Sequence, residues 1–154
     1  MANVTLIPMT EAAYAAWLAQ AVPEYAQDKI AAGTWPAAVA LANAQRAFAS
    51  LLPQGLATPD ALLWTITCEG VGVGSLWVSW DQAQRRFFIY DIKLDAASQD
   101  QGIGTAALRR LDEAAAARGV LRIGLHVFGR NHRARHVYEK AGFAVTDLEM
   151  EKRV

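Results

Sequence analysis

Length, composition and charge limit what this chain can be. Its 154 residues are 53% hydrophobic and 19% charged, which is typical of one globular domain with a single core and excludes a disordered chain. Fifteen basic residues balance 15 acidic ones, so no overall field draws the chain to nucleic acid or to a membrane surface. Cys68 is the only cysteine, which excludes an internal disulfide and a cysteine zinc cluster.

The N-terminal segment predicts neither export nor membrane insertion. Residues 1–8 lack the basic start and the long apolar core of a signal peptide. No apolar run approaches the ~18 residues that span a bilayer. We therefore expect a cytoplasmic protein without nucleic acid or membrane among its partners.

The first third of the chain predicts one strand and two helices. A strand is expected at Val4–Pro8, followed by an Ala-rich helix over Glu11–Ala21 that Thr10 caps and Pro23 interrupts. A second helix is expected from Pro36 to about Leu52, where apolar residues return with helical spacing.

From Ala61 onward, the spacing of hydrophobic residues changes from that of a helix to that of strands. The predicted order of elements is β-α-α-β-β-β-α-β-α-β, an antiparallel meander followed by a parallel, right-handed β-α-β crossover. This is an α/β fold of the mixed-sheet (α+β) type. The expected strands are Ala61–Glu69, Val73–Trp80, Arg86–Leu94, Leu121–Phe128 and Phe143–Met150, and the expected helices are Ile103–Arg118 and His132–Ala141.

A glycine turn between a strand and a helix is the most informative motif. Gln99-Asp100-Gln101-Gly102-Ile103-Gly104 opens the helix predicted at Ile103–Arg118. A turn of this kind presents free backbone N–H groups and the positive end of a helix dipole, which suits a pyrophosphate. Between Arg118 and Lys140, six basic residues accompany a single acidic one. This local excess indicates a small polyanionic ligand.

The glycine turn also has the spacing of a dinucleotide-binding fingerprint. Gly102-x-Gly104-x-x-Ala107 fits that pattern, but only 50 residues follow Gly104 and the strand at Leu121–Phe128 has no acidic residue. A phosphate-binding P-loop is excluded because no Gly-Lys-Ser/Thr follows. A turn that needs glycine for purely structural reasons is the remaining alternative.

A second motif lies about thirty residues further on, at Asn131-x-x-Ala134-x-x-x-Tyr138-Glu139-Lys140-Ala141-Gly142-Phe143. Together with Gln99-x-x-Gly102-x-Gly104, it resembles the acyl-CoA-binding motifs of the GCN5-related N-acetyltransferase (GNAT) superfamily. By motif the resemblance covers roughly Phe87–Phe143, and by element order it covers the whole chain. It implies an N-acyltransferase fold in a single domain over 1–154, with a variable acceptor-side segment at 1–55 and an acyl-CoA-binding core at 61–150.

The resemblance also implies the activity and its partners. We expect direct transfer of an acetyl group from acetyl-CoA to a primary amine of a small molecule or a protein, without a metal ion. A non-catalytic CoA-binding regulatory module is the alternative. A homodimer is left open.

The resemblance assigns the cofactor contacts. Backbone N–H groups from Gln101 to Thr105 would hold the pyrophosphate of CoA. The strand end at Ile92-Lys93-Leu94 would splay from the next parallel strand, pair with the pantetheine arm, and offer the Leu94 N–H to the thioester oxygen. The full predicted set is Ile92, Lys93, Leu94, Gln99, Asp100, Gln101, Gly102, Ile103, Gly104, Thr105, Asn131 and Tyr138.

Three residues are candidates for proton transfer. Tyr138 can donate to the departing CoA thiolate, because a phenol near pKa ~10 is a weaker acid than a thiol near ~8.5 and holds its proton until charge develops on sulfur. His126 and Asp91 are alternative bases for the acceptor amine. A packed strand histidine and a carboxylate that bonds to backbone groups are the structural alternatives.

Acidic residues in the acceptor-side segments and the last strand can attract a cationic amine. A solvated surface is the alternative interpretation for them. They are Glu11, Glu24, Asp28, Asp147 and Glu149.

Overall fold

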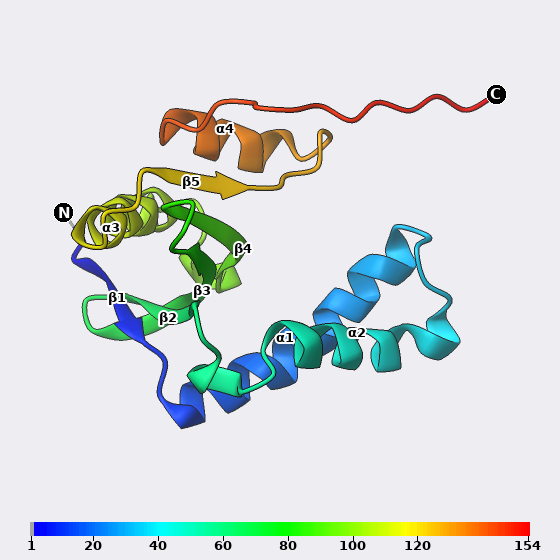
Figure 1. The fold of residues 1–154 in the computed structure, drawn as a ribbon, viewed down its shortest axis with the longest axis horizontal. Coiled ribbons are helices and arrows are strands. Elements are labelled where there is room, and N and C mark those ends of the chain that lie inside the picture. Colours follow the sequence, from blue (N-terminus) through cyan, green and yellow to red (C-terminus); the bar gives the residue numbers. More distant parts are fainter. Residues whose placement is uncertain (1) are drawn as a thin grey trace.

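The computed structural model describes residues 2–154 and contains one five-stranded mixed sheet (Figure 1). The strands lie in the order β1-β2-β3-β4-β5. The first four are antiparallel to their neighbours, whereas β4 and β5 are parallel. This confirms the predicted meander and crossover. The strands are β1 (Val4–Pro8), β2 (Ala61–Cys68), β3 (Val71–Asp81), β4 (Arg86–Leu94) and β5 (Arg122–Leu125).

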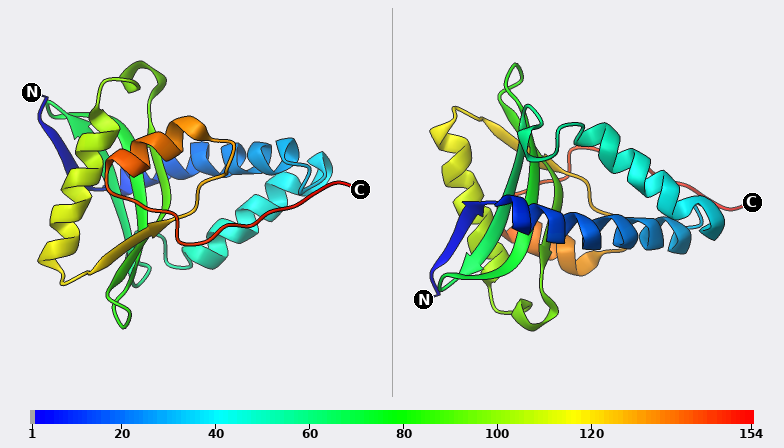
Figure 2. Two further views of the ribbon diagram at one scale, coloured as in Figure 1. Left: turned by 90° about the horizontal axis from the view of Figure 1, so that it is seen from above. Right: turned by 90° about the horizontal axis from the view of Figure 1, so that it is seen from below.

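Four helices accompany the sheet, and short 3-10 turns lie at Gly55–Ala57 and Ala96–Ser98. The helices are α1 (Glu11–Ala31), α2 (Ala37–Leu51), α3 (Ile103–Ala117) and α4 (His132–Lys140). Helices α1 and α2 lie side by side and project beyond the sheet (Figure 2).

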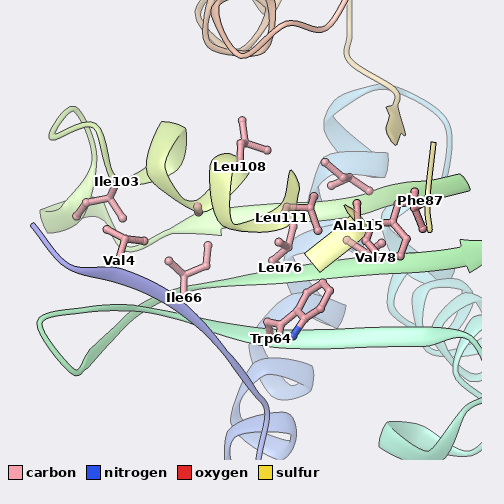
Figure 3. Packing of buried hydrophobic residues seen from close by; sticks show 13 residues of the cluster. Val4, Trp64, Ile66, Leu76, Val78, Phe87, Ile103, Leu108, Leu111 and Ala115 are labelled. Atoms are coloured by element: carbon pink, nitrogen blue, oxygen red, sulfur yellow. The ribbon is translucent and has the colours of Figure 1, made fainter. Parts of the chain in front are cut away.

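Two hydrophobic cores form because side chains alternate along the strands. Trp64, Leu76 and Val78 belong to the core beneath α3, with Ile103, Leu108 and Leu111 from that helix (Figure 3). Their strand neighbours Leu63 and Trp77 belong to the second core, with Phe48 of α2 and Val22 and Ala26 of α1. The sheet therefore separates a face covered by α3 from a face covered by α1 and α2.

The prediction that Pro23 interrupts the first helix is wrong. Helix α1 continues through Pro23 to Ala31. The residues on either side of the proline, Val22 and Ala26, are buried in the second core. Their burial offsets the missing backbone hydrogen bond and the ring clash, which cost about 3 kcal/mol. The predicted cap is present, because the Thr10 hydroxyl accepts from the Ala13 N–H at 3.1 Å.

The expected last strand, Phe143–Met150, is a second correction. Within residues 2–154 this segment pairs with no strand, and its chain runs away from the sheet (Figures 1 and 2). Val145, Leu148 and Met150 are 54%, 71% and 89% exposed. Apolar alternation gives a strand only where a neighbouring strand supplies hydrogen bonds, and here the segment has none.

A bulge in β4 has the greatest influence on the site. Val78 of β3 pairs with Ile89, but Trp77 pairs with Asp91, so Tyr90 is an extra residue. The alternation of side chains reverses there. Phe87 and Ile89 before the bulge, and Ile92 and Leu94 after it, therefore all pack with the α3 core.

The bulge also limits β5. Pairing between β4 and β5 ends at Ile89 and Leu125, where β4 changes course. The prediction of a strand reaching Phe128 is therefore wrong, and His126 lies just beyond β5.

Candidate active site

A groove of about 400 Å³ lies beside the end of β4. Strand β4 continues to Leu94, five residues beyond its last pair with β5 at Ile89, so the two strands leave a gap between them. The groove is lined by the end of β4, the glycine turn, the first turns of α3, and α4. The lining residues are Ile92, Leu94, Gln99, Asp100, Gly102, Ile103, Gly104, Thr105, Leu108, Asn131, Arg133, Ala134, Val137 and Tyr138.

Backbone N–H and C=O groups at the end of β4 point into this gap. N–H and C=O groups of an antiparallel strand point alternately to its two sides. The Asp95 N–H bonds to Val73 of β3 at 2.8 Å. The N–H and C=O groups of Leu94 and Ile92 therefore point the other way, toward the gap. Consistent with this, the Leu94 carbonyl accepts from the Gln99 side chain at 3.2 Å rather than from β3.

The N-terminus of α3 faces the groove without a side-chain cap. Gly102 is its N-cap in the left-handed region, with φ of 77°, and no side chain bonds to the helix end. The first N–H to bond back to the helix is that of Ala106, to the Gly102 carbonyl at 3.1 Å. The N–H groups of Ile103, Gly104 and Thr105 are thus free for a ligand, and the helix dipole favours an anion there.

Two predicted cofactor residues do not line the groove. The Gln101 side chain donates to the Ala97 carbonyl at 2.7 Å and braces the turn. Lys93 points to the other side of β4, where it pairs with Glu24 of α1. The remaining predicted residues are all brought together in the groove.

Asp100 has a partner that the sequence did not indicate. Its backbone has a φ of 61°, and its carboxylate accepts a hydrogen bond from Arg133 at the start of α4. It neither caps α3 nor stands alone in solvent. Both side chains are largely exposed, so the pair contributes little to stability. Because Asp100 and Arg133 both line the groove, an anionic ligand in the groove can reach the Arg133 guanidinium.

Helix α4 positions Tyr138. Asn131 caps the helix by accepting from the Ala134 N–H at 3.2 Å. At the other end, the Phe143 N–H bonds to the Tyr138 carbonyl at 3.0 Å, and the Phe143 ring packs against the Tyr138 ring with centroids 5.8 Å apart. The phenol is half-buried. Burial, and secondarily the charge of Asp91, raise its pKa above 10.0.

A second cavity, of about 620 Å³, lies on the opposite side of β4. Helices α1 and α2 form one wall, and β3 and β4 form the other. Tyr90 and Asp91 both line it, which consecutive residues of a regular strand could not do. The lining residues are Ala21, Pro23, Glu24, Tyr25, Gln27, Asp28, Ala47, Phe48, Leu51, Trp77, Tyr90, Asp91 and Lys93.

Asp91 is the half-buried carboxyl of this cavity. Burial raises its pKa above 3.8; Glu24 and Asp28 act in the same direction, while Lys93 opposes them. Of the acidic residues proposed to attract an amine, Glu24 and Asp28 line the cavity, whereas Glu11, Asp147 and Glu149 do not.

The cavity and the groove lie on opposite sides of β4, where Asp91 lines the cavity and its neighbour Ile92 lines the groove together with Tyr138. The charge of Asp91 acts on the phenol across the strand and raises its pKa. His126 is exposed, and its ring packs edge-on against Phe128 with centroids 5.2 Å apart. It lines neither space. Of the two candidate bases, Asp91 therefore lines the cavity beside β4, whereas His126 lines neither the cavity nor the groove.

Sequence reasoning missed the aromatic wall of the cavity. Phe48, Trp77 and Tyr90 meet there from α2, β3 and β4. Their spacing indicates only core packing, and nothing in the sequence marks Tyr90 as a bulge residue. It also missed Gly74, where a Cβ would lie 2.2 Å from the Lys93 carbonyl oxygen. That glycine allows β3 to approach the end of β4.

The two motifs now have a structural context: a glycine turn opening a helix beside splayed parallel strands, and a tyrosine helix across the gap. The family model described as Acetyltransferase (GNAT) family matches residues 34–143. The chain belongs to this family. As a GNAT protein it is an acetyltransferase.

Its relatives support this assignment along the whole chain. The uncharacterized N-acetyltransferase YycN of Bacillus subtilis is 36% identical over 155 residues, covering 99% of both chains. The uncharacterized N-acetyltransferase YdgE of the same bacterium is 34% identical over 153 residues, covering 97% of this chain and 98% of its own.

Solved structures share the fold. The crystal structure of the putative acetyltransferase YycN has a TM-score of 0.90, with 99% of both chains covered. The structure of AAC(6')-Iy in complex with the bisubstrate analogue CoA-S-monomethyl-acetylneamine has a TM-score of 0.62 at 14% identity, covering 99% of this chain and 98% of that one. At this identity the likeness establishes only a common fold.

Two further observations bear on the site. Within residues 2–154, no group of three or more His, Cys, Asp or Glu side chains is arranged to hold a metal ion. Over the same range, no helix has both the length and the apolarity that crossing a membrane requires.

Proposed function

We propose that this GNAT acetyltransferase moves an acetyl group from acetyl-CoA, bound in the groove, to a primary amine held in the cavity across β4. The observation that carries this proposal is the arrangement of two spaces on opposite sides of the end of β4, the groove with its free helix end and the cavity. A half-buried carboxyl, Asp91, lines the cavity, and a phenol, Tyr138, lines the groove.

The groove offers what an acyl-CoA needs. The free N–H groups of Ile103, Gly104 and Thr105 suit a pyrophosphate, and Arg133 can exchange its Asp100 partner for a phosphate. The β4 edge at Ile92 and Leu94 can pair with the amides of the pantetheine arm as an added strand. The Leu94 N–H then donates to the thioester oxygen as negative charge develops on it. The complex of AAC(6')-Iy with a CoA-containing bisubstrate analogue supports this use of the fold.

Three proton transfers accompany the reaction. Asp91 accepts a proton from the ammonium group of the acceptor, and its raised pKa makes it a stronger base than an ordinary aspartate. The amine nitrogen then bonds to the carbonyl carbon, and the carbon–sulfur bond breaks. Tyr138 donates a proton to the departing sulfur, since its raised pKa keeps the phenol protonated until that moment. The phenolate then takes the second proton of the nitrogen, which leaves a neutral amide and the CoA thiol, and Asp91 returns its proton to water.

Binding of the donor is the first test of this proposal. Isothermal titration of the wild-type protein with acetyl-CoA and with CoA should show one site for each. The Gly104→Asp variant places a carboxylate at the free helix end, so we expect its affinity for both to fall by about tenfold or more. Absence of acetyl-CoA binding by the wild-type protein would overturn the proposed function.

The division into an acceptor-side segment at 1–55 and a cofactor-binding core at 61–150 remains part of this proposal. Its support is that α1 and α2 supply one wall of the cavity but no residue of the groove.

A further inference from the structure

We infer that the acceptor is a small amphiphilic monoamine, with one ammonium group joined by a short linker to an aromatic or branched apolar body. This rests on the proposed function and names the class of substrate that the cavity takes. Three features carry it: the apolar walls, the small number of unpaired carboxylates, and the size of the space.

The walls are aromatic and partly open. The Trp77 and Tyr90 rings stack with centroids 4.8 Å apart, and Phe48 approaches Trp77 at 5.5 Å and Tyr25 at 5.7 Å. Tyr90 is 45% and Leu51 43% exposed, so apolar surface faces the cavity without protein contact. A ligand gains free energy by covering such surface, at roughly 25 cal/mol per Å².

The charges suit a single cation. The cavity contains three carboxylates, and Lys93 already pairs with Glu24. Among residues 2–154, Asp28 and Asp91 have no ion-pair partner, and Asp28 lies exposed at the rim. Asp91 is therefore the less exposed of the two unpaired carboxylates and receives the ammonium group, and Asp28 attracts the cation on its way in.

The same charges disfavour other amines. A polyamine or an aminoglycoside brings several ammonium groups, but besides Asp91 the cavity offers only Asp28, at its rim, as a carboxylate without an ion pair, so a further ammonium group would lose water without gaining an anion. An amino acid would bring its own carboxylate close to Asp91. A volume of about 620 Å³ falls within the range of small-molecule pockets.

A matched panel of amines tests the inference. We would measure kcat/KM from release of the CoA thiol at saturating acetyl-CoA with 2-phenylethylamine, phenylalanine, spermidine and neamine. Tryptophan fluorescence would follow 2-phenylethylamine binding without turnover, since Trp77 lines the cavity. We expect 2-phenylethylamine to exceed each of the others by about tenfold or more.

One substitution and its control test whether the apolar wall of the cavity determines the preference for 2-phenylethylamine. Leu51→Glu places a charge in the apolar wall without touching the groove. It should raise KM for 2-phenylethylamine by about tenfold, with kcat little changed, and should narrow the gap to spermidine. Leu41→Glu is the matched control, because Leu41 is exposed on the same helix but outside the cavity. Thermal unfolding would show that both variants fold.

The outcomes separate this inference from the proposed function. If acetyl-CoA binds but spermidine, neamine or phenylalanine is the preferred acceptor, or no member of the panel is acetylated, the inference is overturned and the donor site stands. An equal effect of Leu51→Glu and Leu41→Glu would also overturn it. If acetyl-CoA does not bind, both proposals fail.

Discussion

Asp91 lowers the stability of the protein at neutral pH. Burial raises its pKa in the folded state, so between its ordinary value and the raised one the folded chain binds more protons than the unfolded chain. Stability is then fullest below the unfolded pKa, falls as pH rises through this window, and stays lower above it. A group that destabilises the fold while lining a cavity is a candidate for function.

Replacing this carboxyl should separate stability from activity. Asp91→Asn removes the half-buried charge, so we expect Tm at pH 7 to rise while kcat/KM falls by about 10²- to 10⁴-fold. The acid limb of the pH–rate profile, which reports protonation of Asp91, should disappear in the variant.

Asp112→Asn is the control for this prediction. Burial also raises the pKa of Asp112, but this residue lies on α3, outside both the cavity and the groove. Its replacement should leave the rate unchanged. A lower Tm together with an unchanged rate in Asp91→Asn would contradict the role of this carboxyl.

The phenol of Tyr138 gives an independent prediction. Tyr138→Phe keeps the ring packed against Phe143 and removes only the proton donor. We expect kcat to fall by about 10²-fold, with acetyl-CoA affinity and Tm nearly unchanged. Steady-state kinetics, calorimetric titration and thermal unfolding of one preparation would measure all three. An unchanged kcat would exclude Tyr138 as the acid, and undetectable wild-type turnover would favour the CoA-binding module.

The contact between β3 and β4 depends on one glycine. A Cβ at Gly74 would lie 2.2 Å from the Lys93 carbonyl oxygen and 2.9 Å from Leu94, so Gly74→Ala forces the two strands apart. We expect a loss of about 1–3 kcal/mol in the free energy of unfolding, measured by urea denaturation. Gly129→Ala should be close to neutral, because no atom lies within 4 Å of the added carbon. Equal stability of the two variants would contradict this account.

Most elements could be predicted from the sequence because local patterns determine them. The Thr10 cap, the period of α3 and the alternation in β2 are properties of neighbouring residues. The interruption predicted at Pro23 is wrong because burial of Val22 and Ala26 outweighs the free-energy cost of a proline ring inside the helix. No local pattern in the sequence reveals that burial. The strand predicted at Phe143–Met150 is wrong because alternation of apolar and polar residues does not indicate whether a partner strand exists.

The groove could be predicted more fully than the cavity, for a physical reason. Groove contacts come from one glycine turn, the strand before it and one helix motif, so each is visible as a run of residues. The cavity gathers Phe48, Trp77 and Tyr90 from three elements distant in sequence, and the bulge that directs Tyr90 into it depends on pairing with β3. The roles of the site residues, His126 included, remain predictions.

Residues 144–154 form a segment that pairs with no strand of the sheet. In residues 144–154 the apolar side chains of Leu148 and Met150 are largely exposed, and no ladder hydrogen bonds protect the backbone. Amide hydrogen exchange should therefore be fast here and slow in β2 and β3. If amide protection of residues 144–154 increased with protein concentration, this expectation would be wrong and a second copy of the chain would be covering the segment. The homodimer remains a prediction.

The bulge at Tyr90 decides which side of β4 each later residue faces. Ile92 and Leu94 face the donor side, and Asp91 and Lys93 the acceptor side, because Tyr90 is left out of the pairing with β3. In a regular strand of the same sequence the two pairs would exchange sides, with Lys93 toward the thioester and Leu94 toward the amine. The chemistry of this segment therefore depends on how the strand is paired as much as on which residues it contains.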